Sequence, residues 1–113
     1  MGILSSNVVL SDPQIQENYQ KMLALCTELS GNLQTSLSHG KEKYIERNRS
    51  RGKLLARDRV EMLLDRDSPF LELLPLVGLD QDDMTLGGSI VAGIGLVQGV
   101  LCLINANIHT IKG

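Results

Sequence analysis

The chain has 113 residues, of which 42% are hydrophobic and 21% are charged, a composition that suits one globular domain with a modest core. Its formal net charge of −2 excludes a general attraction to nucleic acid or to anionic membranes, and no apolar run is long enough to span a bilayer. The sequence therefore predicts neither a nucleic-acid partner nor a membrane partner.

The first residues and the two cysteines indicate the cellular compartment in which we expect the protein. The start lacks the charged region and cleavage site of a secretory signal and the arginines of a transit peptide. It matches the short myristoylation pattern through Gly2 and Ser6, which arises often by chance. Cys26 and Cys102 have no partner at metal or redox spacing, and they suit small buried side chains in a reducing compartment. We expect a cytoplasmic protein.

A long amphipathic helix is predicted to start at Pro13. Asp12 suits the N-cap, and proline suits the first helical position because its missing N–H costs nothing there. Gly31 is a candidate site for a kink. Apolar residues recur every three or four positions and form a stripe along one face of this helix. The stripe predicts that the helix docks on its own protein or on a neighbouring subunit, and its length barely reaches that of a coiled coil. Its apolar residues are Ile15, Tyr19, Met22, Cys26, Leu29, Leu33 and Leu37.

Residues 41–70 begin with a second, charged segment that also has helical propensity and is interrupted by Gly52. A short helix is expected to begin near Ala56 and to be stopped by Pro69. Its predicted apolar face consists of Leu55, Val60, Leu63 and Leu64.

From Phe70 onward the pattern is typical of strands. Residues 70–79 form a short extended run, and two apolar runs around Gln98-Gly99 predict a β-hairpin. Gly93 and Gly95 share one face of the first of these strands, so we expect another layer to approach closely there. The run 100–104 is apolar on both faces, which is typical of a central strand covered on two sides. Two strands and a few helices cannot cover it, so we expect the cover to come from downstream.

The glycines and histidines do not form a recognised site. Gly93 and Gly95 begin a dinucleotide-binding fingerprint, but its third glycine is replaced by Gln98. His39 and His109 are far apart, with no cysteine or carboxylate at ligand spacing, so we predict no metal site. No Ser-His-Asp or Cys-His catalytic set can be assigned either.

Two polar features are candidates for ligand binding. The last strand becomes polar at its end, at the alternate positions Asn105, Asn107 and His109. Polar strand ends line a binding site in some α/β folds, but more often they are simply exposed to solvent. A basic run contains only one acid, Asp58, and could hold phosphate oxygens. It has no aromatic residue nearby for stacking nucleic acid, so a solvated or subunit-facing surface is the first interpretation and a phosphate-bearing small ligand the second. The basic run comprises Arg47, Arg49, Arg51, Lys53, Arg57 and Arg59.

The second half of the chain resembles a known family. The stretches are "RGKLLARDRVEMLLDRDSPFLEL" and "GGSIVAGIGLVQGVLCLINANIHTIKG", which occur in this order. They resemble the start of the carboxyltransferase (β) subunits of biotin-dependent acyl-CoA carboxylases, especially the methylcrotonyl-CoA and geranyl-CoA carboxylase branch. Residues 107–109 read Asn-Ile-His where that branch usually has Asn-Asp-Ala, so the acyl substrate stays open.

The resemblance implies a fold and a reaction. The fold would be α/β, the N-terminal piece of a crotonase-like spiral, with a helical segment over 1–66 and the start of the carboxyltransferase domain over 67–113, helices being followed by a β-hairpin. The reaction would transfer carboxylate from carboxybiotin, carried on a partner's carrier domain, to an acyl-CoA such as 3-methylcrotonyl-CoA. The glycine pairs that would form its oxyanion holes fall outside this chain. No catalytic residue is therefore assigned, and the chain alone is expected to be inactive.

The resemblance also implies binding residues and partners. Lys53, Arg57 and Lys112 are the candidates for contacts with CoA phosphates. The partners would be other carboxyltransferase subunits, the biotin carboxylase or biotin carrier subunit, and the acyl-CoA itself. Two alternatives stay open: a subunit of a biotin-dependent acyl-CoA decarboxylase, and a non-enzymatic assembly module. Such a module would bind full-length subunits through the striped helix and an open strand edge.

Overall fold

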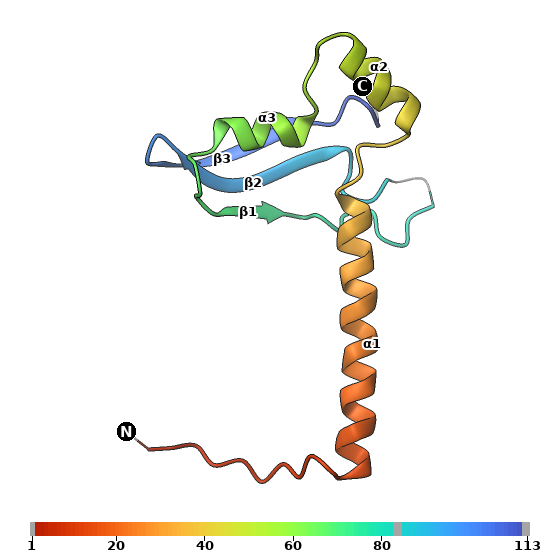
Figure 1. Cartoon of the computed structure of the whole chain (residues 1–113), viewed down its shortest axis with the longest axis vertical. Coiled ribbons are helices and arrows are strands. Elements are labelled where there is room, and N and C mark those ends of the chain that lie inside the picture. Colours follow the sequence, from red (N-terminus) through yellow and green to blue (C-terminus); the bar gives the residue numbers. More distant parts are fainter. Residues whose placement is uncertain (1, 83–84, 112–113) are drawn as a thin grey trace. The chain divides into compact units, whose positions relative to one another are not determined.

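The computed structural model describes residues 2–82 and 85–111 (Figure 1). The chain divides into two compact units, residues 1–32 and 33–113. The predicted boundary near residue 66 stays a prediction. The described elements are α1 (Pro13–Ser36), α2 (Glu42–Ser50), α3 (Ala56–Leu63), β1 (Phe70–Leu73), β2 (Ile90–Val97) and β3 (Val100–Asn107).

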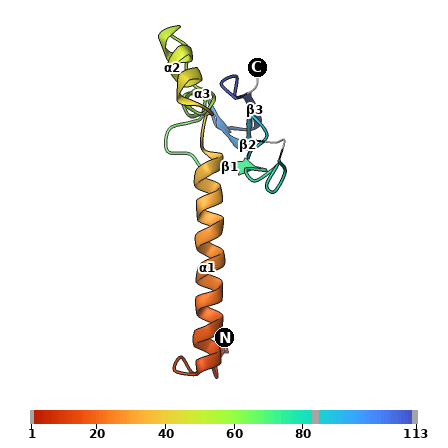
Figure 2. The ribbon, with the colours of Figure 1, turned by 90° about the vertical axis from the view of Figure 1, so that its right-hand side faces the viewer.

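The helix α1 begins at the predicted residue. The backbone N–H of Gln14 donates to the Asp12 carboxylate over 2.8 Å, which confirms Asp12 as the N-cap. The helix runs through Gly31 without a break (Figure 2). Cys26 is exposed, so the prediction of a buried thiol is wrong here, because nothing within the described residues 2–32 covers this side chain. Among the described residues, no helix is long and apolar enough to cross a membrane.

The three strands form one antiparallel sheet in the order β1-β2-β3. Gln98 and Gly99 connect β2 to β3 with φ angles of 51° and 75°, the left-handed conformation that a type I′ hairpin turn requires. The Asp65 carboxylate accepts hydrogen bonds from the backbone N–H groups of Gln98 (2.6 Å) and Gly99 (2.7 Å). The predicted hairpin is confirmed.

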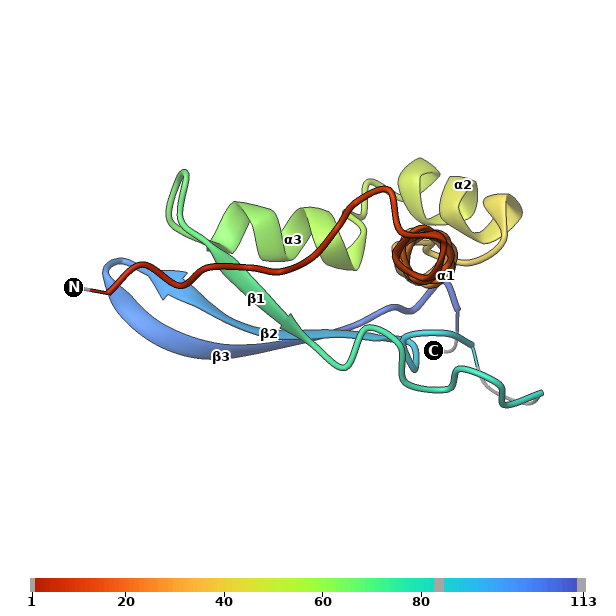
Figure 3. The same cartoon turned by 90° about the horizontal axis from the view of Figure 1, so that it is seen from below.

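The core lies between α3 and one face of the sheet (Figure 3). Gly93 and Gly95 belong to this face. A Cβ atom on Gly93 would overlap the ring of Phe70, and one on Gly95 would overlap the side chain of Leu64. The predicted close approach is confirmed, and it is made by these side chains and, at Gly93, also by the backbone carbonyl of Leu71. The buried cluster consists of Ala56, Val60, Val91, Ile104 and Ile108.

The helix α3 is shorter than predicted. It begins at Ala56 as expected but ends at Leu63, well before Pro69. The chain leaves the helix because Leu64 adopts an extended ψ of 149° and the N–H of Asp65 donates to a carbonyl of the sheet. This exit lets Leu64 pack against the core, whereas Leu63 is 50% exposed and was wrongly predicted to belong to the apolar face.

One strand prediction also needs correction. The extended run after Phe70 is a strand only as far as Leu73, because Leu74 has a φ of 56°. The strand β3 lies at the edge of the described sheet, so the cover on both faces that its apolar sequence predicts stays a prediction. Its side chains Leu101 and Leu103 are 71% and 76% exposed on the face opposite α3. Within the described part of the 33–113 unit, α3 is the helix that packs on the sheet, and it packs on the other face.

Candidate functional site

The loop after α2 is fixed by Asn48. Gly52 takes a φ of 68°, which lets the chain reverse direction after the helix. The Asn48 side-chain amide donates to the carbonyl oxygens of Lys53 (3.1 Å) and Leu54 (3.3 Å). Its backbone carbonyl accepts from the N–H of Lys53 over 3.2 Å. Residues 51–54 are therefore held against the last turn of α2.

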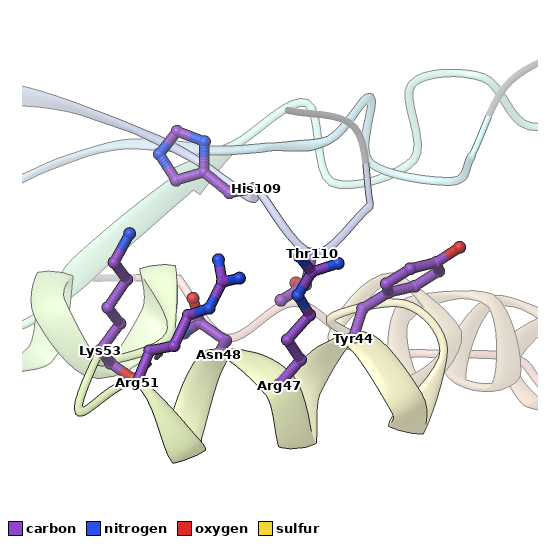
Figure 4. A pocket seen from close by; sticks show the side chains of 7 residues that line it. All are labelled: Tyr44, Arg47, Asn48, Arg51, Lys53, His109 and Thr110. Carbon is purple, nitrogen blue, oxygen red and sulfur yellow. Dashed lines mark hydrogen bonds between the residues drawn. The ribbon is translucent and has the colours of Figure 1, made fainter.

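This loop, α2 and the segment after β3 enclose an open cleft of about 290 Å³ (Figure 4). We call it the basic cleft. A neighbouring cavity of about 440 Å³ shares Asn48, Lys53 and His109 with it and continues along Leu54 to Arg59. The basic cleft is lined by Tyr44, Arg47, Asn48, Arg51, Lys53, His109 and Thr110.

The basic cleft carries uncompensated positive charge. Its cations are Arg47, Arg51 and Lys53, and no carboxylate belongs to the described lining of either cavity. Within the described residues, none of the three cations has a salt-bridge partner. Each exposed cation alone would bind an anion weakly, but several cations around one concavity favour a ligand with more than one negative charge. Phosphate groups fit this arrangement through charge-assisted hydrogen bonds.

The structure separates the predicted CoA-binding residues. Lys53 lines the basic cleft. The Arg57 guanidinium instead forms a bidentate ion pair with Glu72, at 2.8 and 2.7 Å, and also donates to the backbone carbonyl of Ser36 over 3.3 Å. Lys112 lies outside the described residues. The assignment of these residues to CoA stays a prediction, with the Arg57 side chain already engaged by a carboxylate.

The structure also joins two features that the sequence left apart. The end of β3 meets the basic run, because His109 and Thr110 line the same cleft as Arg47 and Arg51. Asn107 lines a small adjoining cavity.

Sequence reasoning assigned no binding role to three residues of the lining, Tyr44, Asn48 and Thr110. The expectation that no aromatic residue lies near the basic run is wrong, because Tyr44 is one helical turn before Arg47 and lines the same cleft. Its spacings of three residues to Arg47 and four to Asn48 place all three side chains on one face of α2, which was the available signal.

His39 sits beside α3, outside the cleft. Its Nε2 accepts the backbone N–H of Arg57 at 3.5 Å, which needs the neutral imidazole. Burial lowers the pKa of His39, and the positive charge of Arg57 lowers it further. Among residues 2–82 and 85–111, no three His, Cys, Asp or Glu side chains are grouped to hold a metal ion.

Comparison with known proteins identifies the family. Residues 47–113, more than half of the chain, match the carboxyl transferase domain. The chain belongs to the carboxyl transferase family. The match begins at Arg47, so it includes most of the basic cleft and the whole sheet.

Individual family members are similar over nearly the whole chain. The chain is 43% identical to the probable mitochondrial methylcrotonoyl-CoA carboxylase beta chain of Drosophila melanogaster, over 99% of this chain and 20% of that protein. It is 43% identical to the biotin-dependent 3-methylcrotonyl-coenzyme A carboxylase beta1 subunit of Mycobacterium tuberculosis, over 89% of this chain and 19% of that protein. The chain thus spans about one fifth of the length of the curated relatives it matches.

A solved structure confirms the fold class. The beta subunit of geranyl-CoA carboxylase from P. aeruginosa matches 97% of this chain and 21% of its own, with a TM-score of 0.80 and 34% identity. The predicted α/β, crotonase-like fold of the carboxyltransferases is confirmed.

Proposed function

We propose that this chain is part of a carboxyltransferase subunit of a biotin-dependent acyl-CoA carboxylase. The reaction is transfer of carboxylate from carboxybiotin to an acyl-CoA such as 3-methylcrotonyl-CoA. The observation that carries the proposal is the family match over residues 47–113, which includes most of a cleft whose cations have no salt-bridge partner among the described residues. The two curated relatives support the substrate class, since both are named for methylcrotonyl-CoA carboxylation.

The chain's contribution would be to bind and orient CoA. Carboxybiotin, on its carrier domain, supplies the carboxylate, and no residue of this chain is assigned to it. CoA is the only reactant with several phosphate groups, and the basic cleft presents Arg47, Arg51 and Lys53 to them. Lys112 would add a further cation from beyond the described segment. Arg57 would act indirectly, by holding α3 against β1 through Glu72.

The partners follow from the same proposal. They are other carboxyltransferase subunits and the biotin carboxylase or biotin carrier subunit. We place the reaction in the cytoplasm, in keeping with the free thiols of Cys26 and Cys102.

The proposal is tested with the complete polypeptide, as its native source makes it, supplied with its carboxylated biotin carrier. We expect carboxylation of 3-methylcrotonyl-CoA that avidin abolishes, because avidin sequesters biotin. Decarboxylation of the acyl-CoA product without forward carboxylation in the native complex would instead favour the decarboxylase subunit. Absence of both activities toward all acyl-CoAs tested would contradict the proposal.

One observation keeps the assembly module as a second candidate. The face of the sheet opposite α3 presents exposed leucines on its two outer strands, β1 and β3, and β3 forms an open edge within the described sheet. Such a surface suits association with further protein. The intact mass of the native polypeptide separates the candidates. A mass several times the 12.4 kDa of this chain supports the enzyme, and a mass equal to it supports the module. The exposed leucines of this face are Leu71, Leu73, Leu101 and Leu103.

A further inference from the structure

The apolar stripe of α1 is exposed along one unbroken helix (Figure 2). Tyr19 and Met22 are 60% and 59% exposed, and the thiol of Cys26 is exposed as well. The stripe residues alternate at spacings of four and three, which are the core positions of a coiled coil. Within α1 they are Ile15, Tyr19, Met22, Cys26, Leu29 and Leu33.

The positions that flank the stripe are apolar only in the middle of the helix. Leu23 and Leu25 flank it there, on its two sides, and both are exposed. The apolar surface is therefore widest around Ala24 and narrows alike toward both ends of the helix. The flanking residues toward the two ends are polar and uncharged: Gln16, Asn18, Ser30 and Asn32.

The charged side chains of α1 lie away from the stripe. They are Glu17, Lys21 and Glu28, whose helical spacing places them on the outer face. Glu17 and Lys21 pair with each other over 2.6 Å. A partner on the stripe therefore meets no charge, so a second copy of the same helix can approach without repulsion.

We propose that α1 pairs antiparallel with α1 of a second copy of this chain, with the pair centred on Ala24. Residues equally far before and after Ala24 then meet. Met22 faces Cys26 of the second copy, and Tyr19 faces Leu29 of the second copy. The inference goes beyond the proposed function, since the pairing needs neither CoA nor biotin.

The flanking residues favour antiparallel over parallel pairing. In the antiparallel pair Leu23 packs on Leu23 of the second copy, and Leu25 packs on Leu25. In a parallel pair the flanking positions would meet between successive heptads, so Leu23 would face Asn18 and Leu25 would face Ser30. Apolar side chains are stabilised by burial against one another, which the antiparallel pair provides for all four leucines.

Cysteine cross-linking in the complete native polypeptide tests this register. The double variant Met22→Cys/Cys26→Ser is produced together with wild type and oxidised with oxidised glutathione. We expect a disulfide between residue 22 of one copy and Cys26 of the other, with a doubled mass on non-reducing electrophoresis and the linked peptides identified by mass spectrometry. Ala24→Cys/Cys26→Ser is the matched control. Its new thiol lies at the same level on the outer face and should form no link to Cys26.

A charge exchange at Leu25 tests whether this residue faces its own counterpart. Leu25→Glu on both copies of the cross-linking pair should lower the yield of the 22–26 disulfide by about tenfold or more, because two like charges are then opposed. Leu25→Glu on one copy and Leu25→Lys on the other should restore the yield. Failure of the opposite charges to restore it would contradict the register.

Two further results would overturn the inference. A disulfide between the Cys26 residues of two wild-type copies would show parallel pairing, because the antiparallel pair keeps these thiols on different levels, beyond bridging range. Absence of the 22–26 link in a polypeptide that carboxylates acyl-CoA would show that the stripe docks elsewhere, and the inference fails while the proposed function stands. If the link forms and no acyl-CoA is carboxylated, the inference stands and the proposed function fails.

Discussion

Arg57 and Glu72 form a bidentate ion pair that joins α3 to β1. Their oxygen–nitrogen distances are 2.8 and 2.7 Å, and their side chains are only 21% and 22% exposed. The same guanidinium donates to the carbonyl of Ser36 at the end of α1. One arginine therefore connects three segments of the 33–113 unit.

Replacement of Glu72 by glutamine tests the stabilising role of this pair. The variant leaves a half-buried guanidinium without its carboxylate, so we expect the free energy of unfolding to fall by about 2–3 kcal/mol. Glu61→Gln, on the exposed part of α3, is the control and should change it by less than about 0.5 kcal/mol. Urea denaturation followed by circular dichroism measures both. Equal midpoints for the two variants would show that the ion pair adds nothing.

The hairpin turn depends on Asp65. Its two carboxylate oxygens accept the N–H groups of Gln98 and Gly99, and a single neutral amide cannot accept both as strongly. We expect Asp65→Asn to lower the free energy of unfolding by about 1–3 kcal/mol and to speed amide hydrogen exchange at residues 98 and 99. Asp67→Asn is the matched control. Unchanged exchange at the turn in Asp65→Asn would contradict this role.

Two glycine-to-alanine substitutions should change the stability of the protein in opposite directions. The added methyl group at position 93 would overlap the Phe70 ring and the Leu71 carbonyl oxygen, so Gly93→Ala should destabilise the protein by about 1–3 kcal/mol. Position 31 has open space around it within α1, so Gly31→Ala should stabilise that helix by about 0.5–1 kcal/mol. Thermal unfolding of both variants measures the difference. A stable Gly93→Ala protein would mean that Phe70 can move away at little cost.

Stability should decline in mild acid because of His39. Its pKa is lowered in the folded state, chiefly by burial, so the folded chain binds a proton less readily than the unfolded chain. Stability should therefore fall as the pH drops from about 6.5 toward the lowered pKa, and level off below it. Arg57 and Arg49 oppose protonation, and Asp58 favours it. NMR titration of the imidazole gives the pKa directly, and a value above that of His39 in the denatured chain would contradict the prediction.

The sequence predicts local structure here more fully than packing. The Asp12-Pro13 start of α1 and the Gln98-Gly99 turn depend on the preferences of adjacent residues, and both are confirmed. The end of α3 could not be predicted in this way, because it is set by a hydrogen bond from Asp65 to the distant Leu96.

In the candidate site, too, local sequence patterns were predictable and tertiary contacts were not. The basic run and the polar end of β3 were both visible in the sequence, but only folding brings His109 beside Arg51. Glu72, which forms the ion pair with Arg57, is 15 residues away in sequence, and no helical or strand periodicity relates the two positions. Tyr44 could have been found, because helical spacing alone relates it to Arg47.

The most direct test of the proposed CoA site is the KM of the complete native polypeptide for acyl-CoA in a Lys53→Ala variant. Lys53 lines the basic cleft, so its removal should raise KM about tenfold, as expected for one charge-assisted phosphate contact, with kcat nearly unchanged. Lys41→Ala, an exposed lysine just before α2, should leave both constants at wild-type values. A KM in Lys53→Ala equal to that of Lys41→Ala would contradict the claim that this cleft binds CoA.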